Sequence, residues 1–142
     1  MWYIADLVEE ITVEGETENV VHVNTVLLEA DDDESAYAAA LAEAYDDEYE
    51  NPAGQMVRFR FVGLRELVRV FDELEHGAEL AYEERVGVSS EELSDLVTER
   101  GDLAVFRPPE PRSGPDYTSR EIMEEAKRRV RQGRAGGDGS AL

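Results

Sequence analysis

The chain has 142 residues, of which 34% are charged, and its formal net charge at pH 7 is −20. This length predicts one domain with a hydrophobic core, and the lack of cysteine excludes disulfides, thiolate nucleophiles and Cys-ligated zinc. The start of the chain has no signal-peptide pattern, and no stretch approaches the roughly 20 apolar residues of a membrane helix. We therefore expect a cytoplasmic protein that does not enter a membrane.

The charge is distributed unevenly along the chain. Sixteen Asp and Glu and no Lys or Arg precede Arg58, whereas eight basic and six acidic residues follow position 106. An acidic body repels nucleic acid and anionic lipid and attracts cationic partners. The pattern favours a basic protein partner over nucleic acid, with solubility or life in a salty cytoplasm as the simpler alternative.

Two extended, β-branched segments open the chain. Residues 2–14 and 20–28 flank a polar turn, which predicts an antiparallel hairpin. His22 lies inside the second strand. Because no His, Cys or regularly spaced acid accompanies it, a packed or edge histidine is favoured over a metal ligand or general base.

A helix is expected after Asp31-Asp32-Asp33, which offers N-caps at the positive end of the helix dipole. Its apolar residues fall on one helical face: Ala36, Tyr37, Ala40, Leu41, Ala44 and Tyr45. The alanines would let a sheet approach closely, and the larger side chains would line one edge of that face. Pro52 then ends the helix.

The next two segments complete the expected core. Val57, Phe59 and Phe61 alternate with less apolar positions, as in a strand with one apolar face. Residues 64–74 have helical spacing and residues 79–86 read as a further strand. The expected order is β-β-α-β-α-β, an α+β fold with a mainly antiparallel sheet and helices on one face, followed by C-terminal helices.

Several motifs resemble a family of small bacterial proteins. They are Trp2-Tyr3, Ser35-Ala36-Tyr37 in the acid-led helix, the Asn51 to Gly54 turn, Val57-x-Phe59-x-Phe61-x-Gly63 and Gly77-Ala78-Glu79-Leu80. Over about residues 1–86 the chain resembles domain-of-unknown-function family four-two-eight-eight. The motifs are structural, and the resemblance brings no activity, ligand or catalytic residue. His76-Gly77-Ala78-Glu79 stands where members have Asp-Gly-Thr-Glu, which weakens any role for that acid.

The C-terminal part contains two capping boxes. Ser89 with Glu92 opens a helix that ends by Gly101, and Thr118 with Glu121 opens another. Residues 103–106 are a short strand or extended cover. The expected divisions are an α+β domain (1–106), a Pro-rich linker (107–116), a C-terminal helix (117–132) and a disordered tail (133–142). The Arg-rich helix is expected to pack on the acidic body of its own chain or, exchanged in a homodimer, on that of a second subunit.

Two groups of residues are candidate contacts. The first group is an acidic face that could contact a partner: Asp31, Asp32, Asp33, Asp46 and Asp47. Helix capping explains the first three. No calcium-loop pattern is present, so a metal site is not favoured. No phosphate loop or Ser-nucleophile motif is present either. We expect no cofactor and no catalytic residue.

Arg58, Arg60 and Tyr82 form the second group, as an anion or partner contact. The two arginines project from the non-apolar face of a strand, where salt bridges to cross-strand acids such as Glu83 are the favoured interpretation.

The leading hypothesis is a small acidic interaction module that binds a basic partner, as an inhibitor or an immunity-like protein does. One alternative is a protein or enzyme that binds an anionic small molecule through Arg58, Arg60 and Tyr82. Another is a self-associating structural domain, because the first two strands are apolar on both faces.

Overall fold

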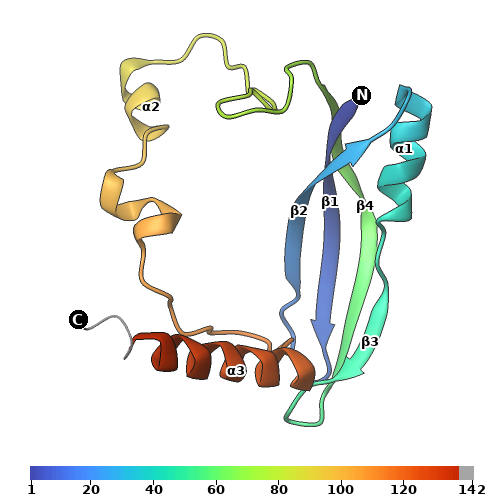
Figure 1. Ribbon diagram of the computed structural model, residues 1–142, viewed down its shortest axis with the longest axis vertical. Coiled ribbons are helices and arrows are strands. Elements are labelled where there is room, and N and C mark those ends of the chain that lie inside the picture. Colours follow the sequence, from blue (N-terminus) through green and yellow to red (C-terminus); the bar gives the residue numbers. More distant parts are fainter. Residues whose placement is uncertain (138–142) are drawn as a thin grey trace.

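A computed structural model describes residues 1–137 and contains one antiparallel sheet, one helix against it and a long excursion of the chain (Figure 1). In chain order the elements are β1 (Trp2–Val13), β2 (Val20–Glu29), α1 (Asp33–Ala42), β3 (Asp47–Glu50), β4 (Met56–Val70), α2 (Ser90–Asp95), η1 (Arg100–Asp102), η2 (Ala104–Phe106) and α3 (Arg120–Gly137). This confirms the α+β class, and the order is roughly the expected one.

The four strands lie in the order β2-β1-β4-β3, and every neighbouring pair is antiparallel. The hairpin of β1 and β2 is confirmed, with an unbroken register from Trp2 opposite Glu29 to Ile11 opposite Val20. β1 and β4 are the inner strands, while β2 and β3 form the two edges.

β4 is much longer than expected, and the predicted helix over residues 64–74 is wrong. Its residues continue as a strand to Val70, paired with β1 over the whole length. Two register shifts each insert an extra residue into β4, so that Phe61, Leu64 and Leu67 lie opposite Glu9, Leu7 and Ala5. Apolar residues on one sheet face thus recur every three positions, which imitates helical spacing.

The predicted strand over residues 79–86 is also wrong, because these residues form no regular element. β3, which the sequence did not predict, occupies the edge next to β4. Three of its four residues are acidic, so no hydrophobic alternation marked it as a strand.

α1 begins in the predicted stretch, and Asp32 is the N-cap among the three candidates: its Oδ1 accepts a hydrogen bond of 2.7 Å from the backbone N–H of Ser35. Ala36 and Ala40 are fully buried against the sheet. Small side chains allow this close approach, as expected. The helix ends at Ala42, well before Pro52.

The core has two parts, both on the sheet face that α1 covers, which we call the α1 face. The first part lies near the start of β1 and joins Tyr3, Ala5 and Leu7 to α1. The second part lies near the end of β1 and joins Ile11 and Val13 to β4 and to aromatic rings at that end of the sheet. The first strand is therefore buried chiefly through its odd-numbered residues.

Residues 71–115, which we call the arm, leave the end of β4 and travel far from the sheet before returning to its opposite end (Figure 1). Residues 71–114 are exposed, apart from the half-buried Ala78 and Val88. The predicted N-cap at Ser89 is confirmed, since its Oγ accepts a hydrogen bond from the N–H of Glu92, which is the Ser89 half of the predicted capping box. Residues 104–106 form a 3-10 turn, not the short strand that was one expectation.

Asp116 and Tyr117 follow the arm, and we call them the anchor because they return the chain to the sheet. The amide of Asn51 donates to the carbonyl of Asp116 (3.0 Å), and the hydroxyl of Tyr49 donates to the carbonyl of Tyr117. α3 follows and extends to Gly137, beyond the predicted end at residue 132. The rest of the predicted disordered tail, residues 138–142, lies outside the described residues.

Candidate functional site

The acids at the start of α1, Asp31 to Glu34, are exposed, and two of them accept hydrogen bonds. The bond from the N–H of Ser35 is the main cause that lowers the pKa of Asp32. Asp33 Oδ1 accepts a bond of 2.8 Å from the hydroxyl of Tyr3, whose pKa is raised first by burial and then by that carboxylate. Capping therefore explains part of this cluster, as the sequence suggested.

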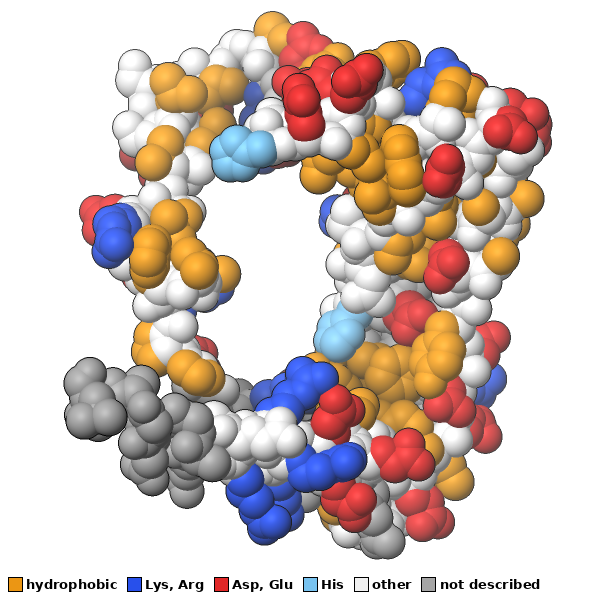
Figure 2. All heavy atoms as spheres, viewed as in Figure 1, with side chains coloured by type: hydrophobic (Ala, Val, Ile, Leu, Met, Phe, Trp, Pro, Cys, Tyr) orange, Lys and Arg blue, Asp and Glu red, His pale blue; other side chains and the backbone are white. Residues whose placement is uncertain are grey.

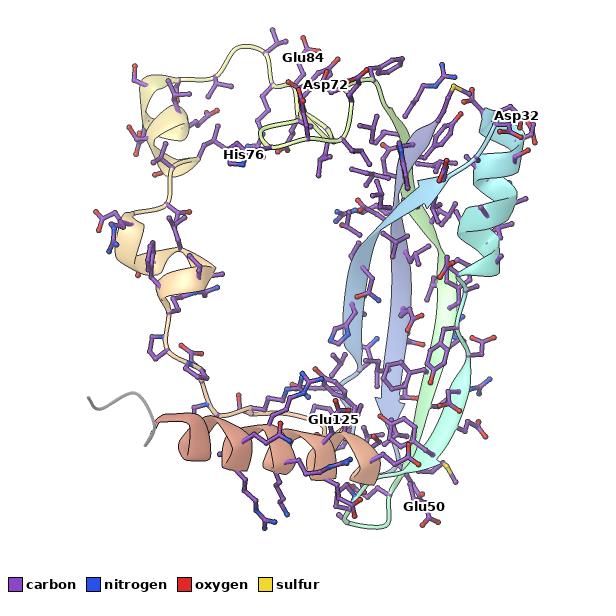
Figure 3. All side chains as sticks on the ribbon, viewed as in Figure 1. Asp32, Glu50, Asp72, His76, Glu84 and Glu125 are labelled. Atoms are coloured by element: carbon purple, nitrogen blue, oxygen red, sulfur yellow. The ribbon has the colours of Figure 1, made fainter. Side chains whose placement is uncertain are left out.

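Asp46 and Asp47 lie at the other end of α1 and also have structural partners. Asp46 Oδ1 accepts a bond of 2.7 Å from the backbone N–H of Phe61. Asp47 Oδ2 accepts one of 2.6 Å from the hydroxyl of Tyr45, and this bond is the main cause that raises the pKa of Tyr45 to about 12. Carboxylates thus lie at both ends of α1 and continue to Glu50 of β3 (Figure 3).

The large apolar side chains of this segment are not in the core. Tyr37 is 50% exposed, Leu41 40% and Tyr45 50%. Since Tyr37 and Leu41 are one helical turn apart, they are neighbours on the surface of α1. We call Tyr37, Leu41, Tyr45 and the flanking Asp31 to Glu34 and Asp46 to Asp47 the α1 surface.

Arg58 and Arg60 are paired with acids of the neighbouring strands. Arg60 Nη2 lies 3.0 Å from Glu10 Oε1 of β1, and Arg58 Nε lies 3.7 Å from Glu48 Oε1 of β3. The structure therefore has the cross-strand salt bridges, but with different partners. Glu83, the acid named as an example, pairs with Arg85 at 2.9 Å.

Tyr82 is separated from the two arginines, because it follows the far end of β4 while they lie near its start (Figure 1). It is 79% exposed and contributes to a cavity of about 450 Å³ beside the end of β4. Arg69, Phe71 and Leu80 also line this cavity. The predicted group of Arg58, Arg60 and Tyr82 therefore does not form one site.

Arg69, which the sequence did not single out, lines this cavity together with Tyr82. Its guanidinium carbon lies 6.0 Å from the ring centre of Tyr3 and 5.7 Å from that of Phe71. Both distances fit a cation–π contact. A partly apolar cavity with one arginine and an exposed tyrosine could hold a small anion.

A buried carboxyl lies where the anchor meets the sheet. Glu9 is only 6% exposed, and its pKa is raised mainly by burial and further by Asp46, with an opposing effect of His22. His22 is directly opposite Glu9 on β2, and its Nε2 lies 3.3 Å from the hydroxyl of Tyr117. The His22 and Tyr117 rings are 5.3 Å apart, edge to face. The half-buried edge histidine thus helps to hold the anchor.

Sequence reasoning missed the role of Glu9, although a signal was present. The odd-numbered residues of β1 are buried from Tyr3 to Val13, and Glu9 is the charged member of this row. Tyr117 had no such signal, because it follows a Pro-rich segment and its partners are distant in sequence.

Two kinds of feature are absent from the described residues, 1–137. They contain no group of three or more His, Asp or Glu arranged to hold a metal ion. No helix among them is long and apolar enough to cross a membrane.

Comparison with known proteins gives a family and nothing further. The model of a family described as a domain of unknown function, DUF4288, matches residues 2–82, more than half of the chain. The match covers the sheet, α1 and the start of the arm. No curated protein and no solved structure matches the chain.

Proposed function

Because the chain belongs to the DUF4288 family, whose description assigns no function, we propose one from the geometry: the protein is an interaction module that binds a basic segment of another protein on the α1 surface. The binding would resemble that of an inhibitor or immunity-like protein. The observation that carries the proposal is the exposure of Tyr37 and Leu41 between two groups of carboxylates.

Composition supports a cationic partner. Residues 31–50 contain nine Asp and Glu and no Lys or Arg. An aromatic and an aliphatic side chain, surrounded by charge of one sign, resemble the centre and rim of a protein interface. Carboxylates would attract the partner and speed its association, while Tyr37 and Leu41 would provide the apolar contact.

The test is a titration of the protein with a labelled amphipathic peptide that carries Arg and Leu. We expect Tyr37→Ala to weaken binding about tenfold, since truncation of a central interface tyrosine costs more than about 1 kcal/mol. Asp31→Asn with Glu34→Gln should weaken binding at low salt and less so at moderate salt.

A matched control separates this surface from general attraction to an acidic protein. Glu16→Gln with Glu18→Gln removes the same charge from the exposed β1–β2 turn. Equal losses for the two double variants, or unchanged affinity in Tyr37→Ala, would show that the α1 surface is not the site.

The cavity at the end of β4 supports a second candidate, an anionic small molecule bound by Arg69. Its volume of about 450 Å³ is within the usual range for ligand sites. A thermal-shift screen of anionic metabolites tests this, since a ligand at a hundred times its Kd stabilises by about 2.7 kcal/mol. A genuine ligand should lose its shift in Arg69→Gln and keep it in Arg65→Gln, the neighbouring arginine that pairs with Asp6.

A further inference from the structure

The two edges of the sheet differ in their protection against further strand pairing. β3 has four residues, three of them acidic. β2 has ten, and nine of them belong to residues 19–28, the longest run in the chain without Asp, Glu, Lys or Arg. Proteins protect edges with short strands, charges, prolines or bulges. β3 has two of these devices; β2, which the structure describes in full, has none along residues 20–28.

β2 also exposes apolar side chains beside its open edge. Val21, Val23 and Leu27 are 53%, 39% and 47% exposed. They lie opposite Glu10, Val8 and Ile4, on the sheet face away from α1. We call these three residues the β2 stripe.

The arm faces this edge across an opening that passes through the molecule, with hydrophobic side chains on both sides (Figure 2). Leu93, Val97 and Val105 of the arm are 59%, 76% and 81% exposed. Within the described residues no sheet or helix covers them. A hydrophobic arm held away from its own sheet is typical of a segment that packs on another chain.

We propose that a second copy of this chain pairs with β2 through its own β2, antiparallel about a two-fold axis, so that two sheets become one. Two chains with a net charge of −20 repel each other, and the repulsion is weakest where charge is absent over a long stretch, as it is along residues 20–28. A two-fold axis places β2 of one copy against β2 of the other. The two paired strands therefore have the same length and the same lack of charge.

The area of contact explains the arm. Ten residues extend about 34 Å, and a sheet is about 10 Å thick, so the paired edges bury roughly 700 Å² over both copies. Stable interfaces need about 1,200 Å² or more. Because the arm lies in front of the β2 edge of its own chain (Figure 2), it must move aside to admit the second sheet. The arm of each copy then supplies the difference by covering the β2 stripe of the other.

The geometry restricts the register. A two-fold axis perpendicular to the sheet keeps the α1 faces of both copies on the same side of the joined sheet. Each even-numbered residue of β2 must then pair with an even-numbered residue of the second β2, and each odd-numbered residue with an odd-numbered one. β2 extends from Val20 to Glu29. If the two β2 strands pair over almost their full length, the two-fold axis passes beside either Asn24 or Thr25. That residue then lies opposite the same residue of the second chain.

The first test is the molar mass in solution by light scattering. We expect about twice 15.9 kDa and a dimer that tightens as salt rises, because salt screens repulsion between the copies. Binding of a basic peptide to the α1 surface would weaken with salt, so the two proposals fail independently. A monomer at high concentration and high salt would overturn this one.

Matched variants locate the interface. Val23→Glu puts a carboxylate on the β2 stripe, and Val62→Glu makes the same change at a similarly exposed valine of β4. We expect Val23→Glu to raise the dimer dissociation constant about tenfold or more, and Val62→Glu to leave it nearly unchanged. Equal effects would place the contact elsewhere.

A cross-linking test does not depend on those variants folding. The chain has no cysteine, so one introduced thiol reports one contact. Under mild oxidation either Asn24→Cys or Thr25→Cys should give a covalent dimer, because opposed residues bring Cα atoms to about 5 Å. Ser90→Cys on the arm is the control. No cross-link above this control at either position would contradict the proposal.

Discussion

Replacement of Tyr117 by alanine should release the arm from the sheet while leaving the sheet folded. The Tyr117 ring contacts His22, lies 6.4 Å from the Phe59 ring and is covered by the guanidinium of Arg112 at 4.0 Å. Alanine removes these contacts. The strands keep their own hydrogen bonds, so the loss falls on docking of the anchor and not on global unfolding.

The size of the effect follows from burial. Tyr117 is mostly buried, which for a side chain of roughly 200 Å² means about 150 Å² removed from water. At about 25 cal/mol per Å² this gives 3–4 kcal/mol as an upper estimate, and we take about 3 kcal/mol. The undocked fraction should then rise about 100-fold.

Limited trypsin digestion measures this fraction. Both bonds, Arg112–Ser113 and Arg85–Val86, lie in exposed parts of the chain. Trypsin must bind the arginine side chain, and that of Arg112 is held over the Tyr117 ring, whereas that of Arg85 pairs only with the exposed Glu83. In Tyr117→Ala we expect cleavage after Arg112 to accelerate by about 100-fold and cleavage after Arg85 to stay constant. Tyr117→Phe, which keeps the ring, should change the first rate less than tenfold. Equal cleavage after Arg112 in wild type and the alanine variant would refute the anchoring role.

Three further predictions concern stability. Because the folded-state pKa of Glu9 is raised, its charged form destabilises the fold at neutral pH, so Glu9→Gln should raise the unfolding free energy at pH 7 by on the order of 1 kcal/mol. This gain in urea titrations should vanish as the pH falls through that pKa; a constant difference would contradict it. Ala40→Leu should destabilise by about 1–3 kcal/mol because no space remains between α1 and the sheet, whereas the exposed Ala38→Leu should be nearly neutral in thermal unfolding. Asp32→Ala should lower the melting temperature more than Asp31→Ala, because only Asp32 caps α1. Folding lowers the pKa of Asp32, so the difference in melting temperature between the two variants should shrink as the pH falls through the folded-state pKa. Equal melting temperatures at neutral pH would argue against the cap.

The residues of β4 show why sequence periodicity misled. Phe61, Leu64 and Leu67 lie on the α1 face at intervals of three, because bulges opposite β1 insert one extra residue after each of the first two. An isolated sequence with this spacing is typical of a helix. Pairing with β1 over the full length of β4 supplied hydrogen bonds and burial that outweighed the local pattern.

The α1 surface was only half predictable. The cap at Asp32 and the alanine stripe follow from local chemistry, and both are present. The exposure of Tyr37 and Leu41 does not, because apolar residues at helical spacing normally face a core. One narrow helix on the sheet buries its alanines and leaves the larger side chains outside.

The sequence by itself determined the acidic character, the hairpin of β1 and β2, a helix start within Asp31 to Asp33, another at Ser89, and the α+β class. These depend on composition, on strand alternation and on capping groups within a few residues of one another. Only the tertiary structure decided the length of β4, the β3 edge, the burial of Glu9 beside His22 and the return of Tyr117 to the sheet. Each of these depends on contacts between residues far apart in the chain, whose free energy no local pattern contains.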